Sequence, residues 1–526
     1  MTIKRERKDM IKKVFASVLI CILTLSFCVH AEDYYNSDEV YSELMPRVKD
    51  QGKNPDCWSF AAIDAAEHSM AVNEKVSFKD ENSGFSPYHM AACMNITKNE
   101  AFNAYTRSHT DGGNRESATA YFARGVFSGP VKMREFQKDL YGFYNQKKTD
   151  YFLLFPPKKE AYLTRAHFIT DKKEGSSYIC FGEDGIEFDK NEGVITRIKD
   201  AIKKYGAVSA SYCAYERDQK TYYNPSTGAY CAPWEDFAGG TTPDGNRVIK
   251  TDDGYSFVES ANHTVTVVGW DDNYSFSNFK DIPMSKKGDE VAIRDGAWIV
   301  KNSWGENFGN GGYEYISYMD PCFGRNATAY EFEYLPSYKV KTHAQKGIMR
   351  GVRFPSVGYG VCLAERFDNV KGTIEAIGIY VCDTNATVEV IIDTDREEKL
   401  KIFNKGQLAN NRIVLKDIET GERARSWKFA EKGYYMLFPD EPLEVKDGVD
   451  LYIKYTVEEK SDILVGAGNN SENDGDFTKS VSCWSHITGS GKILEWKETG
   501  YNWSINLFVK EDMFKFKSME KFKLTK

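Results

Sequence analysis

The kind of secondary structure that the sequence predicts changes once along the chain, at residues 335–345. Before this point, helical patterns alternate with short apolar runs that are typical of strands. After it, almost every apolar run is strand-like and is bounded by turn residues. Two patterns of this kind need two separate cores, so we expect an α+β domain followed by an all-β sandwich or jelly roll.

The same patterns place the individual elements. We expect helices at 57–70 and 197–206, the second ended by Gly206, because glycine readily adopts the left-handed conformation that follows a helix. Strands of the first domain are expected at 207–212, 264–270 and 297–304. Strands of the second domain are expected at 373–381, 387–393, 433–438, 450–457 and 502–509.

The N-terminus has the three parts of a secretory signal peptide. Residues 1–13 carry six basic and two acidic side chains, an apolar run spans 14–29, and Ala31 ends a small-residue cleavage site. The run of 16 residues is shorter than the ~20 that a membrane-spanning helix needs. We therefore expect cleavage after Ala31 and a secreted or cell-surface protein, with an uncleaved membrane anchor as the alternative.

Charge and cysteine spacing exclude several classes of partner. The net charge of −8 becomes −12 without the first 31 residues, because they carry six bases and two acids. An acidic protein lacks the basic surface that binding to nucleic acid requires. No pair of closely spaced cysteines and no cysteine–histidine cluster suggests a metal site, so we expect no cofactor.

The chemistry of the first domain begins at Cys57, which starts the helix expected at 57–70. The unpaired N–H groups and the positive dipole of a helix N-terminus stabilise a thiolate, which is the nucleophilic form of cysteine. The same N–H groups can bind the oxyanion that forms when a carbonyl is attacked. Gln51, on a loop six residues earlier, offers a second donor. Taken alone, a cysteine of this kind is more often a buried structural residue.

Two later segments supply the groups that a nucleophilic cysteine needs. His263 heads a predicted strand in SANHTVTVVGW, where it can pair with the thiolate and protonate a leaving amine. Asn302, in AWIVKNSWG, can hold an imidazole ring by a hydrogen bond that Trp304 would shield from water. Each of these residues, taken alone, also fits a structural role.

In this order, QGKNPDCWSFA, ANHTVTVVGW and WIVKNSWGENFGNGGY resemble the papain-like cysteine peptidases over residues 40–335. The resemblance implies a two-lobed α+β fold in which Cys57 is the nucleophile and His263 the acid and base. It also implies that Asn302 orients the imidazole and that Gln51 completes an oxyanion hole with the Cys57 amide.

Other residues match positions near the substrate in this family. Gly112 and Gly113 resemble the loop that pairs with substrate backbone, although an ordinary turn before a helix is the alternative. Asn262 occupies a frequent Asn/Asp position beside the cleavage site, and Trp304 follows the orienting asparagine.

The sequence departs from the family pattern next to the nucleophile. The cysteine usually found three residues before it is Asn54 here, so one disulfide cannot form. Its usual partner, Cys93, must then be free or paired elsewhere. Asp56 replaces a small residue, and its carboxylate is expected to raise the pKa of the Cys57 thiol.

The spacing of the motifs is also longer than usual. His263 lies 206 residues after Cys57, whereas the usual separation in the family is about 130–150. Most of the excess is expected at 130–195, a stretch rich in lysine and aromatic residues. It either shapes a subsite or decorates the back of the domain, and we favour decoration.

Sequence alone does not pair the remaining cysteines of the exported chain. Besides Cys57 these are Cys93, Cys180, Cys213, Cys231, Cys322, Cys362, Cys382 and Cys483. The resemblance implies a bridge between Cys231 and Cys322, and a Cys213–Cys231 bridge is the rival.

In its pattern of short strands and turns, the second domain resembles the lectin-like β-domain of some secreted bacterial members of the family. That name describes a fold and does not establish sugar binding. Trp484 and Trp496 could stack on cell-wall or glycan sugars, but we expect them to pack in the core. The chain thus divides into a signal peptide (1–31), a papain-like peptidase domain (32–337), a lectin-like β-sandwich domain (338–510) and a basic tail (511–526).

These features predict a secreted or cell-surface cysteine peptidase. It would act as a monomer on proteins or peptides, through a thiolate–imidazolium pair and an acyl-enzyme. The alternative is a catalytically impaired surface adhesin with a relic peptidase domain, which Asp56 and the long insertion motivate. A transferase is a third possibility, because a thioester does not specify its acceptor.

Overall fold

A computed structural model describes the chain between residues 33 and 510, with internal gaps. The described residues are 33–93, 112–124, 128–137, 158–171, 179–182, 185–188, 192–214, 222–232, 248–251, 254–257, 261–280, 294–320, 322–335, 338–342, 350–354, 360–394, 411–457, 463–469, 482–487, 493–499 and 501–510. The predicted signal peptide and basic tail lie outside them. Among the described residues, no helix is long and apolar enough to cross a membrane.

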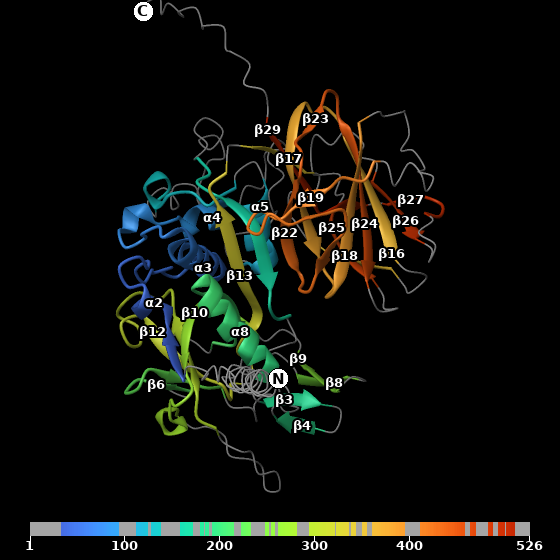
Figure 1. Ribbon diagram of the computed structural model, residues 1–526. Coiled ribbons are helices and arrows are strands. Elements are labelled where there is room, and N and C mark those ends of the chain that lie inside the picture. Colours follow the sequence, from blue (N-terminus) through green and yellow to red (C-terminus); the bar gives the residue numbers. More distant parts are fainter. Residues whose placement is uncertain are drawn as a thin grey trace, which may run out of the picture.

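The helices of the first domain gather around one central helix, α3, shown in blue in Figure 1. Their bounds are α2 (Ser37–Val40), α3 (Cys57–Glu74), α4 (Pro87–Cys93), α5 (Arg115–Ala123) and α8 (Glu192–Tyr205). Every residue of α3 from Cys57 to Val72 is buried, which is the pattern of a helix covered on all sides. Its alanines let α4 and α5 approach closely in one apolar core.

The second lobe of this domain is a sheet with α8 against it. Its strands are β1 (Tyr34–Asn36), β5 (Val208–Tyr212), β6 (Tyr223–Asn224), β7 (Ala229–Tyr230), β10 (His263–Asp271), β11 (Ala297–Lys301), β12 (Tyr313–Ser317) and β13 (Arg325–Glu333). These strands confirm the strands predicted before residue 335. Gly206 has φ +80° and donates its N–H to Ile202, which confirms it as the residue that ends α8.

Two hairpins and one further strand complete the described part of this domain. The hairpins are β3 (Ile179–Gly182) with β4 (Gly185–Phe188), and β8 (Val248–Thr251) with β9 (Gly254–Phe257). The further strand, β2 (Tyr162–Phe168), pairs with β13.

The second domain is built from strands alone in its described part, as predicted. They are β14 (Lys339–Lys341), β15 (Arg350–Phe354), β16 (Gly360–Phe367), β17 (Gly372–Val381), β18 (Ala386–Asp393), β19 (Leu415–Lys416), β20 (Arg423–Ala424), β21 (Trp427–Phe429), β22 (Gly433–Pro439), β23 (Leu443–Val445), β24 (Val449–Val457), β25 (Ile463–Asn469), β26 (Ser482–Ile487), β27 (Lys497–Glu498), β28 (Tyr501–Trp503) and β29 (Ile505–Lys510). The run predicted as one strand at 502–509 is two strands, because the chain leaves the β25 edge at Ser504 before it joins β17.

These strands form a sandwich around an apolar core. The sheet β21-β18-β24-β16-β26-β27 faces the strands β14, β29, β17 and β22, and β15, β25 and β28 form a third sheet at the side. The core alternates along each strand, as the period of two requires. Trp484 and Trp496 are partly buried against apolar clusters of this domain, in agreement with the predicted packing role.

The two domains share one continuous sheet. Its order is β14-β29-β17-β22-β2-β13-β5-β10-β11-β12-β7-β6, so β2 and β22 join the sandwich to the first domain edge to edge (Figure 1). Gly433 permits this contact, because a Cβ at this position would lie 2.0 Å from the carbonyl oxygen of Ala166. The part of the long stretch at 130–195 that contains β2 therefore joins the domains, and our expectation that this stretch is decoration is wrong for this segment.

Charged side chains reinforce the junction. The imidazole of His167 on β2 contacts Glu331 of the first domain at 2.5 Å and Glu431 of the second at 3.4 Å. Arg165 on the same strand pairs with Asp417 of the second domain at 2.5 Å and with Glu331 at 3.7 Å. Burial opposes the charge of His167, but the hydrogen bonds to Glu331 and Glu431 outweigh it and raise the pKa of the imidazole above 6.5.

The cysteines whose side chains the structure describes are all free thiols, so neither predicted bridge forms. In place of the Cys231–Cys322 bridge, a buried carboxylate ties the same two segments together. Asp320 accepts hydrogen bonds from the N–H of Ala232 and of Cys322, both at 2.9 Å. Ala232 is the neighbour of Cys231, and Cys322 is the other half of the expected bridge. These charge-assisted hydrogen bonds therefore take the place of the covalent link.

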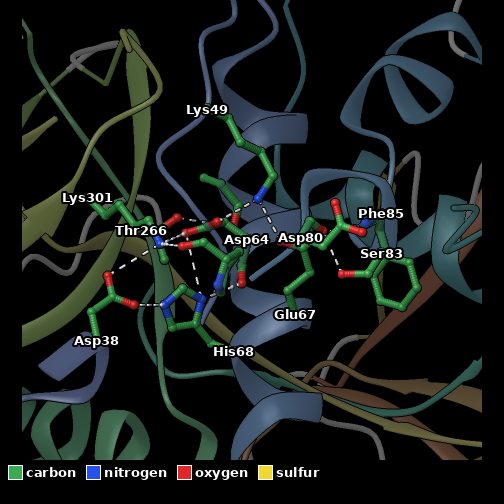
Figure 2. Close-up of polar contacts among 12 residues, drawn as sticks. Asp38, Lys49, Asp64, Glu67, His68, Asp80, Ser83, Phe85, Thr266 and Lys301 are labelled. Atoms are coloured by element: carbon green, nitrogen blue, oxygen red, sulfur yellow. Dashed lines mark hydrogen bonds and ion pairs between the residues drawn. The ribbon is translucent and has the colours of Figure 1, made fainter. Parts of the chain in front are cut away.

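A network of buried charges lies along one side of α3 (Figure 2). Asp38, from the N-terminal segment, contacts Lys301 of β11 at 3.3 Å and His68 of α3 at 2.8 Å. Burial alone would raise the pKa of the Asp38 carboxyl, but the charges of Lys301 and His68 hold it below 3.8. The N-terminal segment, α3 and β11 are thereby linked at one point.

A second part of the network lies one turn of α3 away from His68. Lys49 binds Asp64 at 2.8 Å and Glu67 at 2.6 Å, and Glu67 also accepts the N–H of Phe85 at 2.5 Å. Lys301 is 3.9 Å from the same Asp64 and donates to the carbonyl oxygen of Pro46. The loop that leads to Gln51 is thus held against α3 by the same charges that hold β11.

We predict that Lys301→Met lowers the free energy of unfolding of the first domain by about 3–5 kcal/mol, because it removes one of the cations that compensate the buried carboxylates of Asp38 and Asp64. Urea unfolding followed by tryptophan fluorescence measures this loss. Lys79→Met is the matched control, since Lys79 pairs with Glu43 at the surface, and it should change little. Equal effects of both variants would contradict the structural role of Lys301.

We predict that His167→Gln destabilises the protein by about 2 kcal/mol near pH 5.5, because it removes a charged hydrogen bond. The raised pKa of His167 means that its stabilisation is complete below pH 6.5 and is lost as pH rises through the pKa of the folded state. The difference from wild type in thermal unfolding should therefore shrink by pH 9.

His486→Gln is the control for this measurement. Burial and Lys497 lower the pKa of His486, so its removal should not destabilise the protein at low pH. A difference between His167→Gln and wild type that stays constant from pH 5.5 to pH 9 would mean that His167 is neutral in the junction.

Candidate active site

The structure places Cys57 as the first residue of α3, as predicted, with Asp56 as the residue that precedes the helix. The backbone N–H of Thr264, the neighbour of His263, is near enough to lower the pKa of the Cys57 thiol. The N-terminus of α3 and the start of β10 therefore meet at this thiol. Cys57 and His263, 206 residues apart in sequence, lie on adjoining elements.

Burial, rather than the helix N-terminus, dominates the acidity of the thiol. Burial raises the pKa of Cys57 to about 11, and the N–H groups of Thr264 and Trp58 only partly oppose this. Asp56 raises it further, as predicted, but as a smaller contribution. The thiolate thus needs a cation beside it, which the helix start alone does not supply.

His263 and Asn302 form a defined pair. The imidazole Nε2–H donates to Asn302 Oδ1 at 3.0 Å, and both side chains are buried. The same oxygen accepts the N–H of Ser303 at 2.8 Å, so the amide presents its oxygen to the imidazole. This leaves the other nitrogen of His263 as the one able to exchange a proton with another group.

Trp304 covers this pair. Its ring stacks on the imidazole of His263 with a centroid distance of 4.5 Å and an interplanar angle of 22°. Phe308 holds the indole edge-on at 4.6 Å. An apolar cover of this kind keeps water from competing for the His263–Asn302 hydrogen bond.

Gln51 is buried and is oriented by a residue that the sequence analysis did not single out. Ser303 donates its hydroxyl to Gln51 Oε1 at 2.6 Å, and Gln51 Nε2 donates to the carbonyl oxygen of Asn54 at 2.8 Å. The backbone N–H of Gln51 also donates to Ser303 at 2.8 Å. An amide Nε2 carries two hydrogens, so one remains for a further acceptor. Ser303 stands inside the quoted KNSWG string, but only the tertiary contact reveals its function.

The predicted substrate-contact residues lie around this centre. Gly113 packs on the indole of Trp58, where a Cβ would come within 2.3 Å of the ring, and Gly112 has φ +64°. Both lie just before α5, which begins at Arg115 after the capping residue Asn114. Asn262 is exposed, and its amide exchanges two hydrogen bonds of 2.8 Å with the backbone of Ala214.

A buried carboxylate that the sequence did not indicate completes the site. Glu314 accepts a hydrogen bond from Asn302 Nδ2 at 2.7 Å. In the sequence it stands between Tyr313 and Tyr315, where alternation along a strand is compatible with either face. Among the described residues, no group of three or more His, Cys, Asp or Glu side chains could hold a metal ion.

Comparisons with known proteins find matches to this chain in sequence and in fold. The sequence model described as "Papain family cysteine protease" matches residues 35–331. A variant of the clostridial cysteine protease Cwp84, after propeptide cleavage, is similar in structure, with a TM-score of 0.60 and 17% identity, over 91% of this chain and 99% of that chain. The cysteine protease and lectin-like domains of Cwp84, a surface layer associated protein of Clostridium difficile, match with the same TM-score and 17% identity, over 92% of this chain and 89% of that chain.

These similarities establish the fold, a cysteine protease domain followed by a lectin-like β-domain, as expected from the sequence. No curated protein sequence matches the chain.

We predict that Asp56→Ser lowers the pKa of the Cys57 thiol by less than about one unit, since burial remains the larger cause. Serine is a good residue before a helix, so α3 should keep its start. The pH dependence of alkylation of Cys57 by iodoacetamide, located by mass spectrometry, measures the shift. Asp56→Asn keeps the shape and removes the charge, so it should give the same shift; a shift in the serine variant alone would point to packing instead.

Proposed function

The chain belongs to the papain family of cysteine proteases, and we propose that it hydrolyses peptide bonds through a thiolate of Cys57 and an imidazolium of His263. The observation that carries this proposal is the position of the thiol. Its sulfur faces the N–H of Thr264, directly beside a histidine whose ring is already held by Asn302 and Trp304.

Transfer of the thiol proton is the first step in this mechanism. Because burial raises the pKa of Cys57 to about 11, ionisation requires transfer of its proton to His263 and formation of an ion pair. Asn302 keeps the distant nitrogen of the ring protonated, and Trp304 excludes water from that bond. A positively charged imidazole is the counter-ion that the buried thiolate lacks.

Acyl transfer then follows in two steps. The Cys57 sulfur attacks the peptide carbonyl carbon, and the oxyanion is bound by the Cys57 N–H and by the remaining hydrogen of Gln51 Nε2. His263 gives its proton to the leaving amine as the C–N bond breaks. Water then attacks the thioester, loses a proton to His263 and releases the carboxylic acid and the thiol.

We propose that Gly112, Gly113 and Asn262 contact the substrate backbone or its side chains next to this centre. Two observations support this: Gly113 packs on Trp58, the neighbour of Cys57, and Asn262 is exposed beside His263. We also propose the domain boundaries 32–337 and 338–510. Strand β13 ends at Glu333, and β14 starts at Lys339 and pairs with β29 of the second domain.

We propose that the protein acts outside the cytoplasmic membrane, after removal of residues 1–31. The signal-peptide pattern supports this, as does the similarity in fold to a surface layer associated protein. Contact of the β-domain with cell-wall glycan stays a prediction, since the two tryptophans considered for sugar stacking pack against the core.

We predict that an epoxide inactivator of thiol proteases labels Cys57 in purified protein of residues 32–526, because the imidazole beside this thiol can take up its proton. Mass spectrometry of the peptides locates the adduct, and Cys57→Ala should lose both labelling and cleavage of a peptide library. The other buried thiols serve as internal controls.

Cys93 is the most informative of these controls, because it is a buried thiol beside a histidine. It is also buried, with a pKa raised to about 12 by burial, but it stands beside His89, whose pKa burial lowers to about 3. A neutral histidine of this kind cannot form an ion pair with a thiolate. Labelling of Cys93 with an unmodified Cys57 would overturn the assignment, whereas full cleavage by Cys57→Ala would overturn the proposed mechanism.

A further inference from the structure

Glu314 is a buried carboxylate with no role in the mechanism above. It lies on β12, directly across from Val300 of β11, and its side chain is 1% exposed. The backbone at the start of β12 holds Asn302 as well, because the Asn302 N–H donates to Gly312 at 2.9 Å. Glu314 therefore belongs to the strand that supports Asn302.

A single oxygen of Glu314 receives two hydrogen bonds. Asn302 Nδ2 donates to Oε1 at 2.7 Å, and the phenol of Tyr212 donates to the same oxygen at 2.9 Å. Tyr212 is directly opposite His263 in the β5–β10 pair, and its ring meets the imidazole edge-on at 5.7 Å. The contacts thus form a closed ring of His263, Asn302, Glu314 and Tyr212.

Packing alone does not explain a carboxyl group at this position. Burial raises the pKa of Glu314 to about 7, against the hydrogen bonds from Tyr212 and Asn302, and Asp320 raises it further. No lysine or arginine of the described residues contributes to its pKa. A carboxyl group without a counter-ion destabilises a core, so an apolar side chain would be more stable here.

We propose that Glu314 is a positioning residue for the peptidase reaction: it fixes the amide of Asn302 so that the oxygen, and not the NH₂ group, faces His263. This inference rests on the proposed function. In the opposite orientation, the amide oxygen would face the carboxylate and the NH₂ group would face the imidazole N–H. Both contacts would then be repulsive, so Glu314 selects the productive orientation.

The ionised form of Glu314 also favours the imidazolium of His263, which lies two hydrogen bonds away. The titratable groups that act on Glu314 are Tyr212 from β5 and Asp320 after β12, and Glu314 in turn acts on Tyr223 of β6. The two tyrosines stay neutral in the working range, since the pKa of each is raised, first by burial. Glu314 and Asp320 are therefore the carboxylates whose charge can alter this part of the site.

The test is a comparison of Glu314→Leu and Glu314→Gln with wild type in the full exported chain, on a fluorogenic peptide. We expect Glu314→Leu to lower kcat about 100-fold, as expected when a reacting group loses its orientation, with KM changed less than about threefold. Glu314→Gln keeps an acceptor for Asn302 and should recover most of kcat. In both variants the alkaline limb of the kcat/KM profile should move to lower pH, because the carboxylate that favours the imidazolium is gone.

Matched controls separate orientation from loss of a buried charge. Glu365 is a fully buried glutamate on β16 that accepts the N–H of Trp503 at 2.9 Å, far from the thiol in the second domain. Glu365→Leu and Glu365→Gln should leave kcat and the pH profile of the folded protein unchanged. Near-UV circular dichroism confirms that each variant is folded.

The outcomes decide between the two inferences. A folded Glu314→Leu with wild-type kcat and pH profile would overturn the role of Glu314, and if that variant does not fold, an unshifted limb in Glu314→Gln would do so. Failure of the epoxide to label Cys57 in wild type would instead overturn the proposed function. Normal labelling of wild type with unaffected Glu314 variants would overturn only the present inference.

Discussion

The burial of charged side chains against α3 is the constraint on which the first domain depends. Lys301 lies one residue before Asn302, and it is compensated by Asp38 from the N-terminal segment and by Asp64 from α3. Lys49, two residues before Gln51, is compensated by the same helix. Each unpaired member would carry a large desolvation penalty, so the pairs form together or not at all. The elements that carry the thiol, the amide donor and the asparagine are thereby held in one arrangement.

The second constraint is the junction between the domains. A sheet that continues through β2 and β22 gives the sandwich a fixed orientation relative to the peptidase, because ladder hydrogen bonds set both register and direction. Arg165 and His167 add charged contacts on the same strand. The apolar core of the peptidase also includes Tyr434 and Tyr380 of the second domain. The β-domain is therefore a structural part of the peptidase and not a module on a linker.

At the site itself, the side chains are held by a series of orienting contacts and not by one strong interaction. Ser303 orients Gln51, and the backbone of Ser303 also binds the oxygen of Asn302. Asn302 in turn holds His263, and Trp304 protects that bond. Such contacts prepare the donors before substrate arrives, which is how enzymes avoid reorganisation during the reaction. Burial raises the pKa of the Cys57 thiol, so the proposed ion pair depends on a firmly held histidine.

Much of the molecule was determined by the sequence itself. Helix start, strand periods and the order of the three motifs are local patterns, so they selected Cys57, His263, Asn302 and Gln51 as candidates and predicted both fold classes correctly. Only the tertiary structure decided the β2–β22 junction, the use of Asp320 in place of a disulfide, and the contact of Glu314 with Asn302. These features depend on burial and on contacts between residues far apart in the chain, and neither produces a periodic pattern in the sequence.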